Sequence, residues 1–131
     1  MDWITNNSMR LMQKNLDFTW QKQRVISENI ANAETPGYKS KYITFEDELQ
    51  QKLSSASDKS GRARYDSVRD AIDSSRFVLH RTNTETTRLD GNNVNTDVEN
   101  AELARTQLQY EFLTRQISDQ FSRLRIVIEG R

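Results

Sequence analysis

An apolar heptad repeat in the last quarter of the chain limits the fold more than any other feature. Four of its members recur every seventh residue, and the other three lie three or four residues from them, as along one face of a long helix. They are Leu103, Tyr110, Leu113, Ile117, Phe121, Leu124 and Ile128. Residues 96–99, TDVE, have the spacing of a capping box, and no Pro or Gly follows them until Gly130. The pattern predicts one helix over residues 96–129, roughly 50 Å long at about 1.5 Å per residue.

A second and less regular apolar stripe lies near the start of the chain. Its main members are Met12, Leu16, Ile26 and Ile30. Thr19 and Gln23 occupy the same phase and interrupt the stripe with polar side chains. The spacing predicts a helix over residues 8–34 whose apolar seam is imperfect.

The single proline of the chain marks the end of this first helix. Pro36 disfavours the helical conformation at Thr35, because the proline ring clashes with the preceding residue. Pro36 and Gly37 fit the two central positions of a type II turn, in which Gly adopts a positive φ without steric cost. We therefore expect the chain to change direction here.

The middle of the chain gives weaker signals. Thr44 and Asp47 have the spacing of a capping box, and apolar residues at intervals of four follow, which predicts a short helix over residues 45–53. Residues 54–62 are small and polar, as in a flexible loop. Residues 77–79, FVL, are compatible with a short strand.

Together these patterns predict an all-α fold in a single domain, residues 1–131. Two long terminal helices pack as a coiled-coil-like pair, while the middle region, residues 35–95, is irregular or weakly β and partly disordered. Leu, Ile, Val and Phe make up 29 of the 131 residues, about 22 %, close to the level at which chains tend towards disorder. We expect partner molecules to supply part of the missing burial. The alternative is a self-contained helical hairpin that buries both stripes within one molecule.

The residue inventory argues against catalysis, cofactors and bound metal. The chain has no Cys, and His80 is its one histidine. It therefore lacks a thiol nucleophile, and one histidine makes a histidine-based metal site or a serine triad improbable. Residues 90–93, DGNN, resemble the start of a calcium loop, but Val94 and Asn95 stand where that loop needs a ligand and a glycine. We read them as a turn and expect neither enzymatic activity nor a small-molecule substrate.

Charge and hydropathy indicate that the partners are proteins. Nineteen basic residues balance nineteen acidic residues, so the chain lacks the positive field that attracts nucleic acid. No stretch approaches the roughly 18 apolar residues of a transmembrane helix, which predicts no direct membrane span. The first residues, MDWITNN, lack a basic region followed by an apolar run, so we expect no Sec signal peptide.

Two sequence blocks resemble those of a known family. Residues 27–39, SENIANAETPGYK, closely resemble the N-terminal signature of the flagellar axial proteins, which form the rod, the hook and the hook-associated proteins. The turn residues in this block are Asn29, Asn32, Thr35, Pro36, Gly37 and Tyr38. Residues 89–94, LDGNNV, and the last residues are similar to those of proximal rod subunits, although Asn95 and Thr96 depart from that pattern.

The resemblance implies a structural subunit of the bacterial flagellum. Such a subunit crosses the inner membrane unfolded through the flagellar type III export gate and polymerises as the periplasmic rod of the basal body, near the MS ring. Its terminal helices pack against other copies and other rod proteins, support assembly and transmit torque for motility. A cytosolic coiled-coil adaptor or export chaperone that holds a client with the same helices is the alternative.

Overall fold

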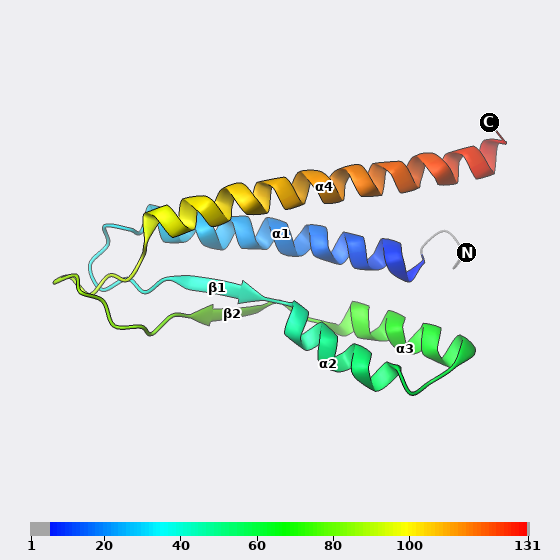
Figure 1. Cartoon of the computed structure of the whole chain (residues 1–131), viewed down its shortest axis with the longest axis horizontal. Helices are drawn as coiled ribbons and strands as arrows, with labels where there is room; N and C mark the ends of the chain where they lie inside the picture. The colour runs from blue at the N-terminus through cyan, green and yellow to red at the C-terminus, as the bar shows by residue number, and fades with distance from the viewer. Residues whose placement is uncertain (1–5, 131) are drawn as a thin grey trace. The chain divides into compact units, whose positions relative to one another are not determined.

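The computed structural model of the chain describes residues 6–130 and is mostly helical over that range (Figure 1). In chain order its elements are α1 (Asn7–Ala31), β1 (Lys41–Thr44), α2 (Glu46–Ala56), α3 (Gly61–Ser74), β2 (Val78–Arg81) and α4 (Thr96–Glu129). The two long terminal helices are confirmed, and α4 has the bounds that its heptad pattern predicts. The fold is nevertheless not purely α-helical, because β1 and β2 form a small sheet.

The chain forms two compact units, and α1 and α4 each contribute to both. One unit, here called the ribbon unit, combines residues 18–44 with residues 77–110 and contains both strands. The other, here called the hairpin unit, contains α2 and α3, the first part of α1 and the last part of α4. Each unit is described by itself.

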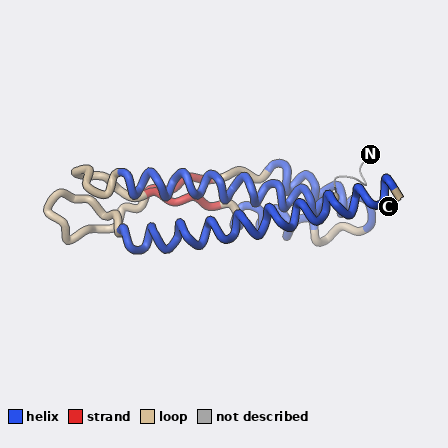
Figure 2. The backbone as a smooth tube through the Cα atoms, turned by 90° about the horizontal axis from the view of Figure 1, so that it is seen from above, coloured by secondary structure: helices blue, strands red, loops and turns tan. Residues whose placement is uncertain are grey.

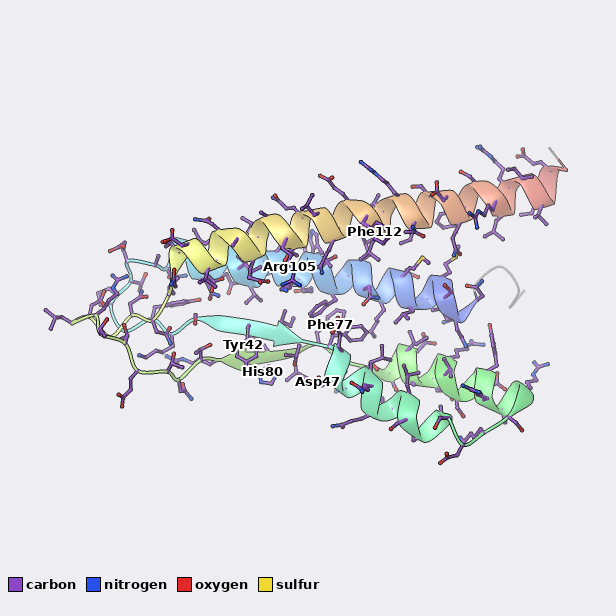
Figure 3. The ribbon with its side chains drawn as sticks, in the orientation of Figure 1. Tyr42, Asp47, Phe77, His80, Arg105 and Phe112 are labelled. Carbon is purple, nitrogen blue, oxygen red and sulfur yellow. The ribbon has the colours of Figure 1, made fainter. Side chains whose placement is uncertain are left out.

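In the ribbon unit, β1 and β2 pair antiparallel, with Lys41 opposite Arg81 and Thr44 opposite Val78 (Figure 2). Tyr42 and His80 face each other in this register, and their rings stack with centroids 4.9 Å apart (Figure 3). A four-residue strand buries little on its own, so the ring pair and the neighbouring helix have to stabilise the ribbon. The strand predicted at residues 77–79 lies one residue later, and β1 was not predicted.

The interior of the ribbon unit is partly polar. Ile26, Thr19 and Thr106 are all buried, and Thr106 is completely so. The Thr106 hydroxyl donates to the Glu102 carbonyl one turn earlier at 2.7 Å, which satisfies it inside α4. The side chains of Lys22 and Glu102 form an ion pair of 3.2 Å between α1 and α4. Coiled-coil pairing along the full length of the two helices remains a prediction.

In the hairpin unit, α2 and α3 pack against each other and bury Leu49, Ala56, Ala71 and Ile72. The sequence led us to expect a flexible loop over residues 54–62, but α2 continues to Ala56 and α3 begins at Gly61. We did not predict α3. Its apolar residues are few among many charges, so its helical spacing becomes informative only when α2 provides a surface to cover.

The structure corrects both predicted capping boxes. Thr44 ends β1, and its hydroxyl lies 2.8 Å from His80 Nε2, while α2 starts after Phe45 without a side-chain cap. At α4 the cap is Asn95, whose Oδ1 accepts from the backbone N–H of Asp97 at 3.1 Å and of Val98 at 3.3 Å. The start of α4 was predicted correctly, but the capping residue lies one position earlier than expected.

Candidate functional site

The two sequence blocks meet at a junction in the ribbon unit. We call residues 29–39 the signature turn and residues 88–95 the asparagine loop. The backbone N–H of Gly37 donates to the Asp90 carbonyl at 2.7 Å, and that of Asn93 donates to the Tyr38 carbonyl at 3.4 Å. The junction therefore fixes the end of α1 and the start of α4 against each other through main-chain contacts.

The signature turn has the predicted type II geometry. Gly37 has φ +71°, and the Tyr38 N–H donates to the Thr35 carbonyl at 3.2 Å, closing the turn. The Asn32 amide donates back to the Glu28 carbonyl at 2.8 Å, and its oxygen accepts from the Thr35 hydroxyl at 3.1 Å. The Glu28 carbonyl also accepts the backbone N–H of Asn32 at 3.1 Å, so the Asn32 side chain adds a second bond where α1 ends and ties the turn to it.

Asn92 joins the asparagine loop to the signature turn and is completely buried. Its amide nitrogen donates to the carbonyls of Asn32 and Thr35, both at 2.9 Å. Its amide oxygen accepts from the Val94 N–H at 2.8 Å. Both amide hydrogens and the oxygen therefore have partners, as a buried side-chain amide requires.

Asn29 plays a similar part between α1 and β1, with only 1 % of its surface exposed. Its amide nitrogen donates to the Lys41 carbonyl at 2.7 Å, and its oxygen accepts from the Lys41 N–H at 2.9 Å. The same oxygen accepts from the Tyr38 hydroxyl at 3.1 Å. The amide thus pairs with Lys41 as a neighbouring strand would, and anchors β1 to the helix.

Asn93 fastens the ends of the ribbon to the same loop. Its oxygen accepts from the Ser40 N–H at 2.7 Å, just before β1. Its nitrogen donates to the Thr82 carbonyl at 3.1 Å, just after β2. Two adjacent asparagines therefore act on different elements, Asn92 on the turn and Asn93 on the ribbon.

Two cations complete the junction. The Arg88 guanidinium donates to the Ala33 carbonyl at 2.9 Å and forms ion pairs with Glu34 at 3.3 Å and Asp90 at 3.0 Å. Lys39 Nζ donates to the Gly91 carbonyl at 2.6 Å. Arg88 binds a carbonyl just beyond the end of α1, where positive charge is favourable because the helix dipole has its negative end there.

A carboxyl and a phenol beside Asn29 have shifted pKa values. Burial raises the pKa of Glu99, and the charge of Glu102 adds to the rise, while a hydrogen bond from Asn29 opposes it. Burial also raises the pKa of Tyr38, followed by the charges of Glu28 and Glu99, while Arg81 opposes the rise. The junction therefore favours the neutral form of both groups.

The arrangement is suited to holding parts together. Most of its bonds run from side-chain amides to backbone groups, which fixes geometry, and the buried Asn92 amide has both of its hydrogens engaged. Within residues 6–130 no group of three His, Cys, Asp or Glu side chains is placed to hold a metal ion. Over the same range no helix is long and apolar enough to span a membrane.

The structure brings most of the predicted turn residues together at the junction. Asn29, Asn32, Thr35, Gly37 and Tyr38 all take part in the junction. We did not predict that Arg88, Asn92 and Asn93 bind the signature turn and the ribbon, although two asparagines after an Asp-Gly pair already indicated a turn.

The predicted seam residues differ in burial. Those that are half-buried are Met12, Leu16, Ile30, Leu103, Tyr110, Leu113, Ile117 and Leu124. Ile26 is buried, whereas Phe121 and Ile128 are 57 % and 63 % exposed. Their role as an assembly interface remains a prediction.

Similarity to known proteins identifies the class. A family model described as flagella basal body rod protein matches residues 19–39, which include the signature turn. The flagellar basal body rod protein FlgB of Bacillus subtilis is 33 % identical over 109 residues, covering 83 % of each chain. FlgB of Borreliella burgdorferi is 31 % identical over 136 residues, covering 93 % of this chain and 96 % of the relative. FlgB of Escherichia coli is 29 % identical over 134 residues, or 94 % of each chain.

The class defined by these matches is that of rod proteins of the flagellar basal body. Within it, the chain belongs to the FlgB family. Its role is that of a structural protein of the flagellar rod.

Proposed function

We propose that this chain is a subunit of the proximal rod, which polymerises through its terminal helices and transmits torque during motility. One observation carries the proposal: α4 is 34 residues long and exposes large apolar side chains along most of its length. These are Val98, Leu108, Phe112, Phe121, Ile126, Val127 and Ile128. Large apolar side chains left exposed in this number indicate that other protein surfaces cover parts of the helix.

The hydrogen bonds of the junction suit a subunit that transmits torque. A subunit that transmits torque has to keep its helices in a fixed relation while force acts between copies. Asn92 binds backbone groups of the signature turn and Asn29 binds Lys41 of β1, so moving α1 relative to the asparagine loop and β1 would break several hydrogen bonds together. The signature turn and the asparagine loop therefore form a rigid corner at one end of the terminal helices.

The partners in this proposal are other copies, other rod proteins, the export gate and components around the MS ring. The chain contains no Cys, so disulfides do not constrain it before or during export. Its low content of large apolar residues suits a subunit that becomes fully stable only beside its neighbours.

A deletion strain tests the proposal. We expect loss of flagella and motility, with both restored by the intact gene, and we expect the chain to co-purify with basal bodies. A cytosolic adaptor or export chaperone would instead remain in the soluble cell fraction. A motile, fully flagellated deletion strain without a second copy of the gene would overturn the rod assignment.

A further inference from the structure

An apolar groove lies within the hairpin unit, between the first part of α1 and one face of α2. Its volume is about 500 Å³, and Phe45, Leu49 and Leu53 line it from the α2 side while Leu11 and Asn15 line it from α1. Phe45 forms a buried floor, whereas Leu11 and Leu53 remain half-exposed on the walls. The groove is of the size in which proteins bind small ligands or a few protruding side chains, roughly 300–1,000 Å³.

One carboxylate, that of Glu46, lines this groove and is exposed. Asp47, the next residue in the first turn of α2, is also exposed but is not part of the lining (Figure 3). Glu48 is already engaged, because it pairs with Lys52 at 3.0 Å and accepts from the Arg76 N–H at 3.0 Å. Among the ion pairs of residues 6–130, none involves Glu46 or Asp47, so both carboxylates are available to a basic partner.

The last turns of α4 carry a ridge with matching properties. Phe121, Arg125 and Ile128 are spaced at i, i+4 and i+7, so they lie along one side of the helix. Phe121 and Ile128 are exposed in the isolated chain, and Arg125 forms no ion pair within the described residues. Apolar anchors at this spacing are typical of a helix that lies in a groove.

We infer that the ridge of one copy, formed by Phe121, Arg125 and Ile128, lies in the groove of a neighbouring copy. The two apolar side chains cover Leu49 and Leu53, and Arg125 meets the carboxylate of Glu46. Because groove and ridge are different surfaces of one chain, the contact is heterologous and can repeat from copy to copy, as a filament requires. This inference rests on the proposed function and specifies one of its polymer contacts.

The contact is small, so the isolated chain should stay monomeric. The groove is lined by eight residues, whereas a stable protein–protein interface has about 20–30 residues a side. In a polymer many such contacts act together, and the effective concentration of each is set by its neighbours. The contact therefore has to be tested in assembled basal bodies.

Cysteine cross-linking tests the contact directly, since the natural chain has no Cys to interfere. One strain co-expresses two full-length forms, one with Gln50→Cys in the groove and one with Ile128→Cys on the ridge. The control strain replaces Ile128→Cys with Arg123→Cys, which lies on the opposite side of α4. Each form has a single thiol, so a disulfide between the two sites joins two molecules. Basal bodies are purified and oxidised, and the linked peptides are identified by mass spectrometry.

We expect the disulfide between positions 50 and 128 to be at least tenfold more abundant than that between positions 50 and 123. Assembled basal bodies that contain the chain but show equal or no cross-linking would overturn the groove contact and leave the rod assignment intact. Linkage of position 50 mainly to another protein would overturn the choice of a second copy. Absence of the unmodified chain from basal bodies would overturn the rod assignment itself.

If the cysteine forms fail to assemble, exchanging the charges of Glu46 and Arg125 tests the same contact between groove and ridge. Glu46→Arg and Arg125→Glu should each lower the number of basal bodies per cell several-fold, and the double variant should restore it. Normal assembly of both single variants, or a double variant no better than either, would overturn the contact.

Discussion

The side-chain amide of Asn92 donates a 2.9 Å hydrogen bond to the backbone carbonyl of Thr35, which lies 57 residues earlier in the chain. Thr35 is exposed, whereas Asn92 has no exposed surface, so a buried side chain of the asparagine loop binds a carbonyl of the exposed turn. The same amide also binds the Asn32 carbonyl at 2.9 Å. The Asn92 amide alone therefore makes two of the hydrogen bonds that hold the asparagine loop against the signature turn.

Removing this amide should loosen the junction. Asn92→Ala leaves the buried Val94 N–H without its partner and creates a void, which should cost about 1–3 kcal/mol. We expect a lower urea midpoint, measured by circular dichroism on the purified chain. Asn83→Ala is the matched control, because Asn83 is exposed. Equal stability of the two variants would show that Asn92 does not hold the junction.

The terminal helices could be predicted from the sequence because their signal is periodic and local. Leu103, Ile117 and Leu124 repeat over many turns, and no helix breaker interrupts them. The turn at Gly37 was predictable for a similar reason, since Pro-Gly restricts the backbone directly. A periodic helix and a Pro-Gly turn can be predicted from neighbouring residues alone, without knowing which other segment packs against them.

The missed elements depend on distant partners. β1 has only four residues, and although Tyr42, Ile43 and Thr44 favour a strand, so short a run is weak evidence without its partner β2, far along the chain. In α3, Ala71 and Ile72 are buried, but the helical spacing of Tyr65, Val68 and Ile72 is hard to recognise among polar and charged residues. For Asn92 the sequence indicates a turn residue, but not that its amide reaches the Asn32 and Thr35 carbonyls.

A side chain at position 37 should strain the turn through the backbone alone. Gly37 has φ +71°, and a Cβ built there would meet no atom within 4 Å, so crowding is absent. Gly37→Val should cost about 1–2 kcal/mol and lower the number of assembled rods seen by electron microscopy. Gly37→Asn should be milder, because Asn tolerates this conformation better. Equal effects of Val and Asn would contradict a requirement for positive φ.

The raised pKa of Glu99 predicts a pH dependence with a definite sign. Folding favours the protonated carboxyl, so its contribution is fully present below the ordinary value of 4.5 and is lost as pH rises through the folded pKa. Glu99→Gln should therefore raise Tm at pH 7 and have little effect at pH 4. The groups that face this carboxyl are Asn29, Tyr38 and Glu102.

Thermal melts across this pH range check the sign. Glu48 has the opposite tendency, since hydrogen bonds from Lys52 and the Arg76 backbone lower its pKa and its contribution is lost as pH falls. The comparison is therefore the difference in Tm between the variant and the natural chain at each pH. A difference that grows towards low pH would contradict the assignment to Glu99.

A carboxylate on the α4 seam should impair assembly more than it impairs folding. Ile117 and Leu124 are half-buried in the isolated chain, so Ile117→Asp or Leu124→Asp should cost it about 1–3 kcal/mol. In a rod the same positions would be closed off by neighbours, and an unpaired charge is much more costly once water is excluded. We expect few or no basal bodies with complete rods in electron micrographs of either variant. Ser122→Asp, at an exposed position of the same helix, should assemble normally. Normal rods from both seam variants would mean that neighbouring copies do not cover this face, and that the exposed apolar side chains of α4 meet them elsewhere.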